Sequence, residues 1–360
     1  MKSKRIAALV TTGVLTLTTA LGLYSWWNTN LFGDDSFCNG KLTPSDLASA
    51  LDTQGRISSV SSSGTTGLPE FRCTVERTSK FLGAEPMKVD VHTAVYAPDF
   101  AFQTRTWKSP ATLSYLSGNV TGAVSADRGW VMLPTSCRDK AGFLGLGRRR
   151  LPAEHEVTVV EARLERGTAE PSKLADLLVK AAARVTESAG CSLGAGDTRP
   201  TLQGPGEEKQ LDTASACGMQ GFAVPADALI DGEVTPGAER VSGTASASWT
   251  CDLRFSGSAE AEVSFSTTSD PSIVNDVLRR TPGWKDLPQG QGEIDGYSRA
   301  ILKCSGKDVY FGMRQDDTYT SVLLDEGKGR WTAVSQAMFQ SFLDAAGKQY
   351  GCPAVKVPRS

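Results

Sequence analysis

The sequence predicts an α+β protein with an N-terminal transmembrane helix followed by two tandem, disulfide-stapled domains. Three observations predict this: an uncharged run behind a basic N-terminus, eight cysteines in two groups of four, and apolar patterns that recur in the same order in each half. Each domain is expected to be an antiparallel sheet with helices on one face, in the order α-β-β-α-β-β-α. A content of 40 % hydrophobic and 22 % charged residues is typical of a folded chain.

The N-terminus predicts the compartment. Residues 1–5 carry three positive charges and 6–27 carry none. At about 1.5 Å per residue such a helix spans roughly 33 Å, enough to cross a bilayer core. We therefore expect 1–5 to be cytoplasmic, 6–27 to be a signal anchor in the cell membrane, and the rest of this single-pass chain to be extracytoplasmic. A cleaved signal peptide is the alternative, and it also exports the chain.

All eight cysteines follow this segment, and an even number in an oxidising compartment predicts disulfides. Four cysteines per domain allow three pairings, of which we favour the one that ties helices to strands. The favoured pairs are Cys38 with Cys73, Cys137 with Cys191, Cys217 with Cys251, and Cys304 with Cys352. With no Cys-x-x-Cys and only two histidines, neither a metal site nor a cofactor is expected.

The cysteine spacing indicates a duplication, because the gaps run short, long and intermediate in both groups. Local sequence also recurs, as in Phe71-Arg-Cys73 and Trp249-Thr-Cys251. The glycine- and proline-rich stretch between the copies is typical of a linker. The expected domains are repeat 1 at 38–192, a linker at 193–216, repeat 2 at 217–352 and a tail at 353–360.

The elements of each copy follow from local patterns. A hydroxyl cap and a proline predict a short helix from Thr43 to Leu51. Alternating apolar residues predict strands, and an apolar stripe predicts the last helix of each copy. In repeat 1 four strands are expected, at 70–77, at 87–96, ending at Cys137, and at 156–164. One helix is expected to begin at 99 and another to cover 171–189. In repeat 2 helices are expected at 271–280 and 331–350, with strands at 297–304, 309–315 and 319–324.

Cys38, the Leu-Thr-Pro-Ser-Asp-Leu that follows it, and a second cysteine flanked by Arg72 and Thr74 together carry a resemblance. This pattern resembles an uncharacterised family of exported actinobacterial lipoproteins, a domain of unknown function. It covers about the first third of each repeat. The chain departs from that pattern by having a membrane span in place of a lipidated cysteine, and two copies in place of one. The resemblance implies an envelope-associated extracytoplasmic domain and supplies no catalytic residue.

Catalytic residues are scarce. No Gly-x-Ser-x-Gly occurs, and His92 lies in an alternating segment where it is expected on the solvent face. His155 lies between two glutamates, where a catalytic Glu-His pair is the alternative to a solvated loop. The acidic pairs Asp316-Asp317 and Glu207-Glu208 lie in turn or linker sequence and are expected to be surface acids. We expect no enzyme.

Gly142 to Arg150 forms an insertion that repeat 2 lacks. Insertions in one repeat are often where binding specificity lies. We therefore hypothesise that Arg148, Arg149 and Arg150 contact anionic lipid or wall polymer, with a solubilising loop as the alternative. A net charge of −2 makes nucleic acid an unexpected partner.

Together these features predict a non-catalytic, membrane-anchored extracytoplasmic binding module of the cell envelope with an unknown ligand. Two alternatives stay open: an accessory or structural subunit of a membrane protein complex, and an envelope enzyme. The expected partners are the membrane through its single span, and an anionic lipid, a wall polymer or another envelope protein.

Overall fold

The structure is a computed structural model, and it describes residues 2–31, 33–80, 85–97, 99–101, 109–145, 148–154, 156–193, 201–229, 237–244, 248–255, 261–325 and 331–358. The chain divides into two compact units. Unit 1 comprises Met1–Ala94, Ala126–Leu151 and Thr158–Arg199; unit 2 comprises Val95–Ser125, Pro152–Val157 and Pro200–Ser360. Residues 95–125 thus belong to unit 2, although they precede the second group of cysteines.

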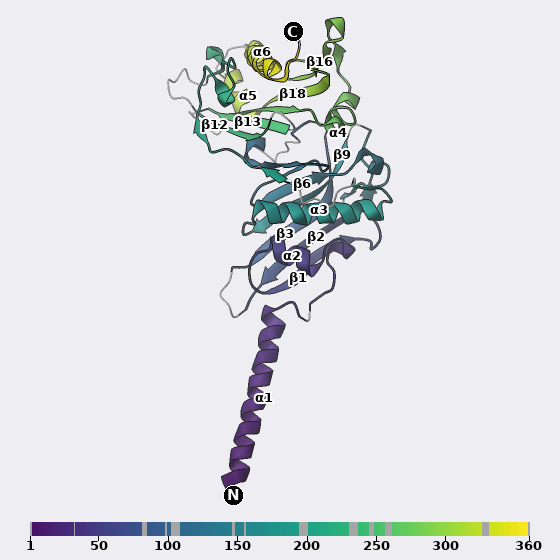
Figure 1. The fold of residues 1–360 in the computed structure, drawn as a ribbon, viewed down its shortest axis with the longest axis vertical. Coiled ribbons are helices and arrows are strands. Elements are labelled where there is room, and N and C mark those ends of the chain that lie inside the picture. Colours follow the sequence, from purple (N-terminus) through teal and green to yellow (C-terminus); the bar gives the residue numbers. More distant parts are fainter. Residues whose placement is uncertain are drawn as a thin grey trace. The chain divides into compact units, whose positions relative to one another are not determined.

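Unit 1 begins with the long helix α1 (Lys2–Asn28), which extends away from its sheet (Figure 1). Among the described residues, no helix is long and apolar enough to cross a membrane. The predicted transmembrane helix at 6–27 and the single-pass cell-membrane localisation are therefore wrong. Hydroxyl side chains interrupt the leucines of α1: those of Thr16, Thr18 and Thr19 donate to main-chain carbonyls one turn earlier, at 2.8–3.0 Å.

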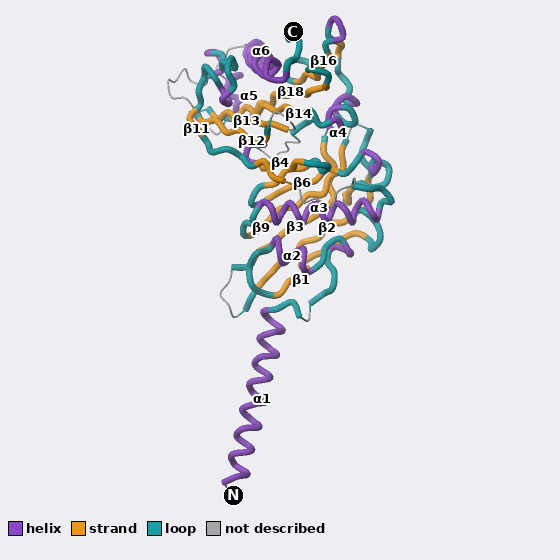
Figure 2. Tube along the Cα trace, in the orientation of Figure 1, coloured by secondary structure: helices purple, strands orange, loops and turns teal. Residues whose placement is uncertain are grey.

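The sheet of unit 1 has the strand order β1 (Arg56–Gly64), β2 (Phe71–Thr78), β3 (Met87–Tyr96), β9 (Val157–Arg166) and β6 (Arg128–Met132). β1 pairs with β2, β2 with β3 and β6 with β9, all antiparallel. Helices α2 (Pro44–Ala50) and α3 (Pro171–Ser188) cover one face of it (Figures 1 and 2). A separate hairpin, β7 (Phe143–Gly145) with β8 (Arg148–Arg150), completes the unit.

The main sheet of unit 2 is antiparallel throughout. Its order is β11 (Lys209–Gln210), β12 (Ala238–Gly243), β13 (Ser248–Arg254), β14 (Glu262–Thr268), β18 (Lys307–Gln315), β17 (Arg299–Cys304), β16 (Gly292–Asp295) and β15 (Lys285–Asp286). Its helices are α4 (Pro271–Val274), α5 (Asp317–Asp325) and α6 (Trp331–Tyr350). Unit 2 also contains β5 (Gly122–Val124), β4 (Ser114–Ser117) and β10 (Thr201–Gln203), in that order.

The predicted order α-β-β-α-β-β-α is wrong for both copies, because antiparallel sheets dominate and helices are few. The helix expected to begin at 99 falls mostly on 102–108, which lie outside the described residues; the residues that follow form a 3₁₀ turn at Pro110–Thr112 and strand β4. The expected strand 319–324 lies within α5, because the Asp316 side chain accepts the Tyr319 N–H at 2.7 Å and starts a helix. Local capping there outweighed the alternating pattern.

Packing between α3 and the unit 1 sheet follows the predicted apolar stripe, which the structure confirms. Leu174, Leu177, Leu178, Ala181 and Val185 are all buried. In unit 2, Phe342 of α6 is surrounded by aromatic rings of β13, β14 and β18. Burial of these large side chains supplies most of the folding free energy of each unit.

All eight cysteines form disulfides, and none is free. The pairs are those that the sequence analysis favoured: Cys38–Cys73, Cys137–Cys191, Cys217–Cys251 and Cys304–Cys352. Two lie in each unit. The first disulfide of each unit joins a 3₁₀ turn, Cys38–Gly40 in unit 1 and Ala216–Gly218 in unit 2, to a strand, β2 and β13 respectively. Stable disulfides are typical of oxidising, extracytoplasmic compartments.

Candidate functional site

The insertion of repeat 1 forms an exposed β-hairpin. β7 and β8 pair antiparallel with Phe143 opposite Arg150 and Gly145 opposite Arg148. All three arginines of β8 are exposed. The structure therefore displays these residues on a regular strand, where successive side chains point to opposite faces.

An ion pair between the exposed Arg149 and a buried carboxylate fixes this hairpin to unit 1. The Glu70 side chain is 1 % exposed, and its Oε1 accepts Arg149 Nε at 2.6 Å and the Gly142 N–H at 2.9 Å. Arg149 Nη2 also donates to the Lys140 carbonyl at 2.6 Å. Charge-assisted bonds of this kind are stronger than neutral ones. Arg149 therefore anchors the hairpin, a role that sequence reasoning missed because Glu70 lies far from it in the chain.

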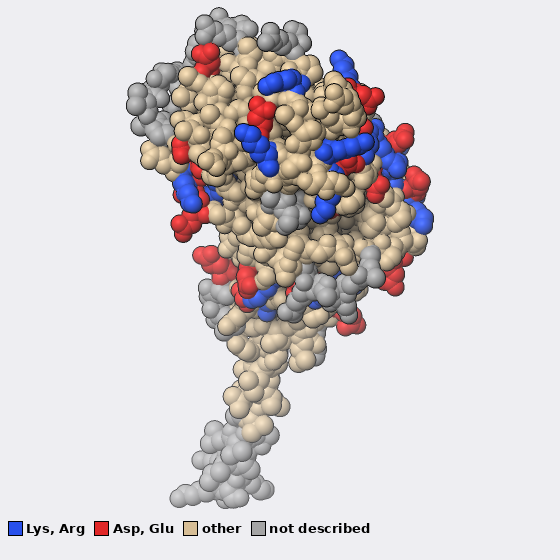
Figure 3. All heavy atoms as spheres, turned by 45° about the horizontal axis from the view of Figure 1, so that its top comes forward, with Lys and Arg blue, Asp and Glu red and all other residues tan. Residues whose placement is uncertain are grey.

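Alternation along β8 places Arg148 and Arg150 on the face opposite Arg149. The Arg150 guanidinium lies over the Phe143 ring, 5.6 Å from its centroid, which orients it. Residues 138–150 also include Arg138 and Lys140, and Asp139 is their one acidic residue. We call residues 138–150 the basic segment. Elsewhere, on the face drawn in Figure 3, acidic and basic side chains are interspersed, so a positive field is local rather than general.

His92 of β3 is half-buried between two carboxylates on the sheet face opposite α3. Its Nδ1 lies 3.2 Å from Asp90 Oδ2 and its Nε2 lies 3.7 Å from Glu161 Oε2. Arg72 Nη2 donates to the same Asp90 oxygen at 3.0 Å. Burial acts to raise the pKa of Asp90, but the hydrogen bond and charge of His92, with the charge of Arg72, hold that pKa below its usual value. The imidazole ring thus lies between two carboxylates, one of which also binds Arg72.

Unit 2 carries a polar cluster on the sheet face opposite α6. Asp252 of β13 is buried, and its Oδ2 accepts the Ala111 N–H at 2.8 Å. Glu262 of β14 accepts Ser109 Oγ at 2.6 Å through Oε2 and Ser264 Oγ at 3.3 Å through Oε1. These bonds hold residues 109–111 against the sheet.

Burial, followed by the negative charge of Glu262, raises the pKa of Asp252 well above its ordinary range. Burial, with a smaller contribution from the negative charge of Asp316, also raises the pKa of Glu262. Two neighbouring carboxyl groups therefore resist ionisation in this cluster. Perturbed carboxyl groups occur at functional sites, but also in networks that fix a structure.

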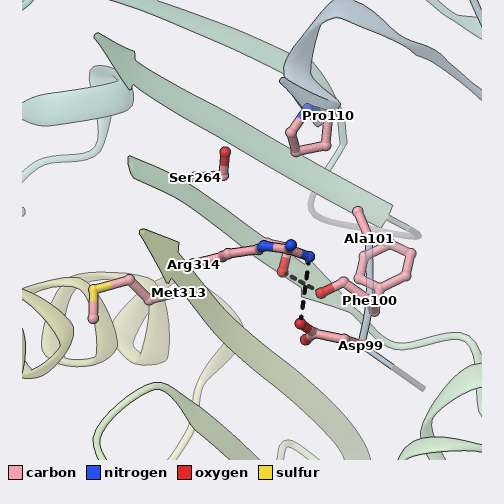
Figure 4. A pocket seen from close by; sticks show the side chains of 8 residues that line it. Asp99, Phe100, Ala101, Pro110, Ser264, Met313 and Arg314 are labelled. Atoms are coloured by element: carbon pink, nitrogen blue, oxygen red, sulfur yellow. Dashed lines mark hydrogen bonds and ion pairs between the residues drawn. The ribbon is translucent and has the colours of Figure 1, made fainter. Parts of the chain in front are cut away.

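A small pocket adjoins this cluster (Figure 4). Arg314 Nη1 and Asp99 Oδ2 lie 3.9 Å apart across it, and Ser266 Oγ donates to the Phe100 carbonyl at 3.1 Å. It is lined by Asp99, Phe100, Ala101, Pro110, Ser264, Ser266, Met313 and Arg314. One hydrogen bond and one ion pair therefore connect residues that line this pocket.

The other acids singled out in the sequence have separate places. Asp316 caps α5, and Asp317 is its first residue. Glu208 forms ion pairs with Arg240, at 3.2 Å, and with Arg254. His155 lies outside the described residues. Within the described part of the chain, no group of three histidine, cysteine or acidic side chains could hold a metal ion.

Comparisons with protein-family models, with curated proteins and with solved structures found no match to this chain.

Proposed function

We propose that this chain is a non-catalytic, extracytoplasmic binding module of the cell envelope, and that its basic segment contacts an anionic wall polymer. The observation that carries the proposal is the rigid mounting of the hairpin: Arg149 is held by the buried Glu70 carboxylate, so Arg148 and Arg150 are displayed on one face of a fixed strand. Eight cysteines in four disulfides support the extracytoplasmic compartment.

Strand geometry supports a polymer as the ligand. Side chains two residues apart on one strand face are separated by about 6.6–6.8 Å. A linear polyanion can contact Arg148, Arg150 and the neighbouring basic residues together, whereas a single anionic group contacts one or two of them. Arginine binds phosphate oxygens in bidentate fashion, which adds to the charge attraction.

The test measures binding of the full-length chain to synthetic poly(glycerol phosphate) and, separately, to vesicles containing phosphatidylglycerol. Replacing Arg148→Gln and Arg150→Gln together is expected to weaken polymer binding about tenfold or more, because two charge contacts are lost. The matched control replaces Arg163→Gln and Arg166→Gln, two exposed arginines on β9.

Equal binding by wild type and the hairpin variant overturns this proposal, as does an equal loss in the β9 control. Binding to the vesicles alone transfers the role from a wall polymer to anionic lipid. Glu70 and Arg149 are left unchanged in these variants, so the hairpin keeps its anchor.

A second candidate is an accessory subunit, and helix α1 favours it. Its described side chains from Val14 to Trp27 include many large apolar groups that are exposed, and extended apolar surface marks an interaction site. Photo-crosslinkers placed at Leu17 and Leu21 in intact cells are expected to capture one protein reproducibly. A crosslinker at the exposed Thr66 is the control, and identical products from both places would contradict this role.

A further inference from the structure

A run of hydroxyl side chains covers strand β1 and the start of the turn that follows it. Seven of the nine residues from 58 to 66 are serine or threonine, and we call this stretch the hydroxyl segment. Residues 57–69 include no charged residue, and Pro69 ends the stretch. Serine- and threonine-rich runs with proline have the composition of O-glycosylated segments.

The whole hydroxyl segment is accessible from solvent. Each residue from Ser58 to Thr66 is exposed, and Ser58 to Gly64 are extended in β1. A second hydroxyl-rich stretch, Ser264 to Thr268 of β14, shows the purely structural use of such residues. All of that stretch is buried, and Ser266 Oγ donates to the Phe100 carbonyl at 3.1 Å. Packing therefore accounts for the hydroxyls of β14 but not for those of the hydroxyl segment.

Hydrogen bonding within the fold also leaves much of the hydroxyl segment unused. Three of its hydroxyls donate to neighbouring groups at 3.1–3.3 Å, namely those of Ser61, Ser62 and Ser63. Within the described part of the chain, the other four make no hydrogen bond: Ser58, Ser59, Thr65 and Thr66. A substituent on any of these four side chains therefore breaks no hydrogen bond of the fold.

We propose that the hydroxyl segment is an O-glycosylation site, modified by a separate glycosyltransferase at the four hydroxyls that the fold leaves unbonded. The hydroxyl oxygen attacks the anomeric carbon of a sugar carried on polyprenyl phosphate, and the bond from that carbon to the phosphate oxygen breaks. Polyprenyl phosphate leaves, and the hydroxyl proton passes to a base of the transferase. The donor is lipid-linked because four disulfides indicate an extracytoplasmic compartment, where nucleotide sugars are absent. This site shares only that compartment with the proposed function, and its test does not involve polymer binding.

Sugar on these hydroxyls also protects an edge strand. β1 ends the sheet order of unit 1, and exposed edges attract other strands unless charges, prolines or bulges prevent pairing. β1 has a bulge between Ser59 and Ser61 but, after Arg56, neither a charge nor a proline. Sugars are bulky and solubilising, so a modified segment stays in water rather than pairing with a strand of another protein.

The experiment is mass spectrometry of the full-length chain purified from the cells that naturally make it. Trypsin releases the site as one peptide, 57–72, because Arg56 and Arg72 flank it and no basic residue lies between them. Fragmentation by electron transfer leaves sugars on their side chains. We expect most copies of this peptide to exceed the sequence mass by whole sugar units on the four unbonded hydroxyls. The same chain made in a host without protein glycosylation is expected to give the sequence mass.

Variants locate the modified positions. Replacing all four unbonded hydroxyl residues by alanine is expected to remove most of the added mass, whereas the control Ser136→Ala with Ser321→Ala, at exposed hydroxyls of a 3₁₀ turn and of α5, keeps it. Matching melting curves of both variants, made in the host without glycosylation, show that both fold, because every changed side chain is exposed. A wild-type peptide 57–72 that carries only its sequence mass overturns the proposal. Added phosphate in place of sugar also overturns it, as does sugar that the fourfold variant retains in full.

Discussion

At the scale of single residues, Asp46 connects a helix start to the body of unit 1. Its carboxylate accepts the Thr43 N–H at 3.0 Å and forms ion pairs with Lys180 at 3.0 Å and Arg184 at 2.7 Å. Burial acts to raise the pKa of Asp46, but these bonds outweigh burial and hold the pKa well below its ordinary value.

We expect Asp46→Asn to lower the free energy of unfolding at pH 7 by about 2–3 kcal/mol, because a buried charge network loses its acceptor. Since the folded pKa is depressed, this stabilisation is present above the unfolded pKa near 3.9 and is lost as pH falls. Urea denaturation at pH 7 and pH 3 tests this. Asp52→Asn, at an exposed ion pair with Lys173, is the control and should change little.

Asp252 and Glu262 are expected to give the free energy of unfolding the opposite pH dependence. Their folded pKa values are raised, so their contribution is complete below the unfolded values near 4 and is lost as pH rises through the folded values. We expect the urea midpoint of wild type to fall with rising pH above 4, and Asp252→Asn to flatten that dependence. Parallel pH curves for the two proteins would contradict this assignment.

At the scale of elements, Phe342 makes the main aromatic contacts that pack α6 against the sheet of unit 2. The Phe342 ring lies 4.8 Å from that of Phe265, 5.6 Å from Phe222 and 6.0 Å from Trp249, measured between centroids. We expect Phe342→Ala to cost about 3–5 kcal/mol by leaving a cavity. Gln349→Ala on the exposed side of the same helix is the control, with a change within about 0.5 kcal/mol. A cost below about 1.5 kcal/mol for Phe342→Ala, measured by denaturation, would disprove this packing.

The elements also show what the sequence could predict. The stripe of α3 was predictable, because helical periodicity is a local signal. Cysteine spacing left three pairings open in each domain, and the pairs that the structure contains were favoured because they tie helices to strands. The placement of residues 109–111 was not predictable, because it depends on bonds to the distant residues Asp252 and Glu262. For the candidate site, the arginines were found from their spacing, whereas Glu70 and the setting of His92 depend on strand pairing that spacing does not encode.

At the scale of the whole molecule, each unit contains a run of paired strands and two disulfides. The strand order β1-β2-β3-β9-β6 in unit 1 corresponds to β12-β13-β14-β18-β17 in unit 2. Against this common framework, the hairpin β7–β8 is a feature of unit 1. The proposed polyanion contact therefore lies where the two halves differ.

If Arg148 and Arg150 bind a polyanion by charge, binding of the polymer weakens with rising salt concentration in proportion to the number of charge contacts. For each phosphate contact, the slope of log binding constant against log salt concentration changes by about 0.7–0.9. We predict that Arg148→Gln with Arg150→Gln makes this slope for poly(glycerol phosphate) shallower by about 1.4–1.8, while Arg163→Gln with Arg166→Gln leaves it unchanged. An identical slope for wild type and the hairpin variant would contradict the claim.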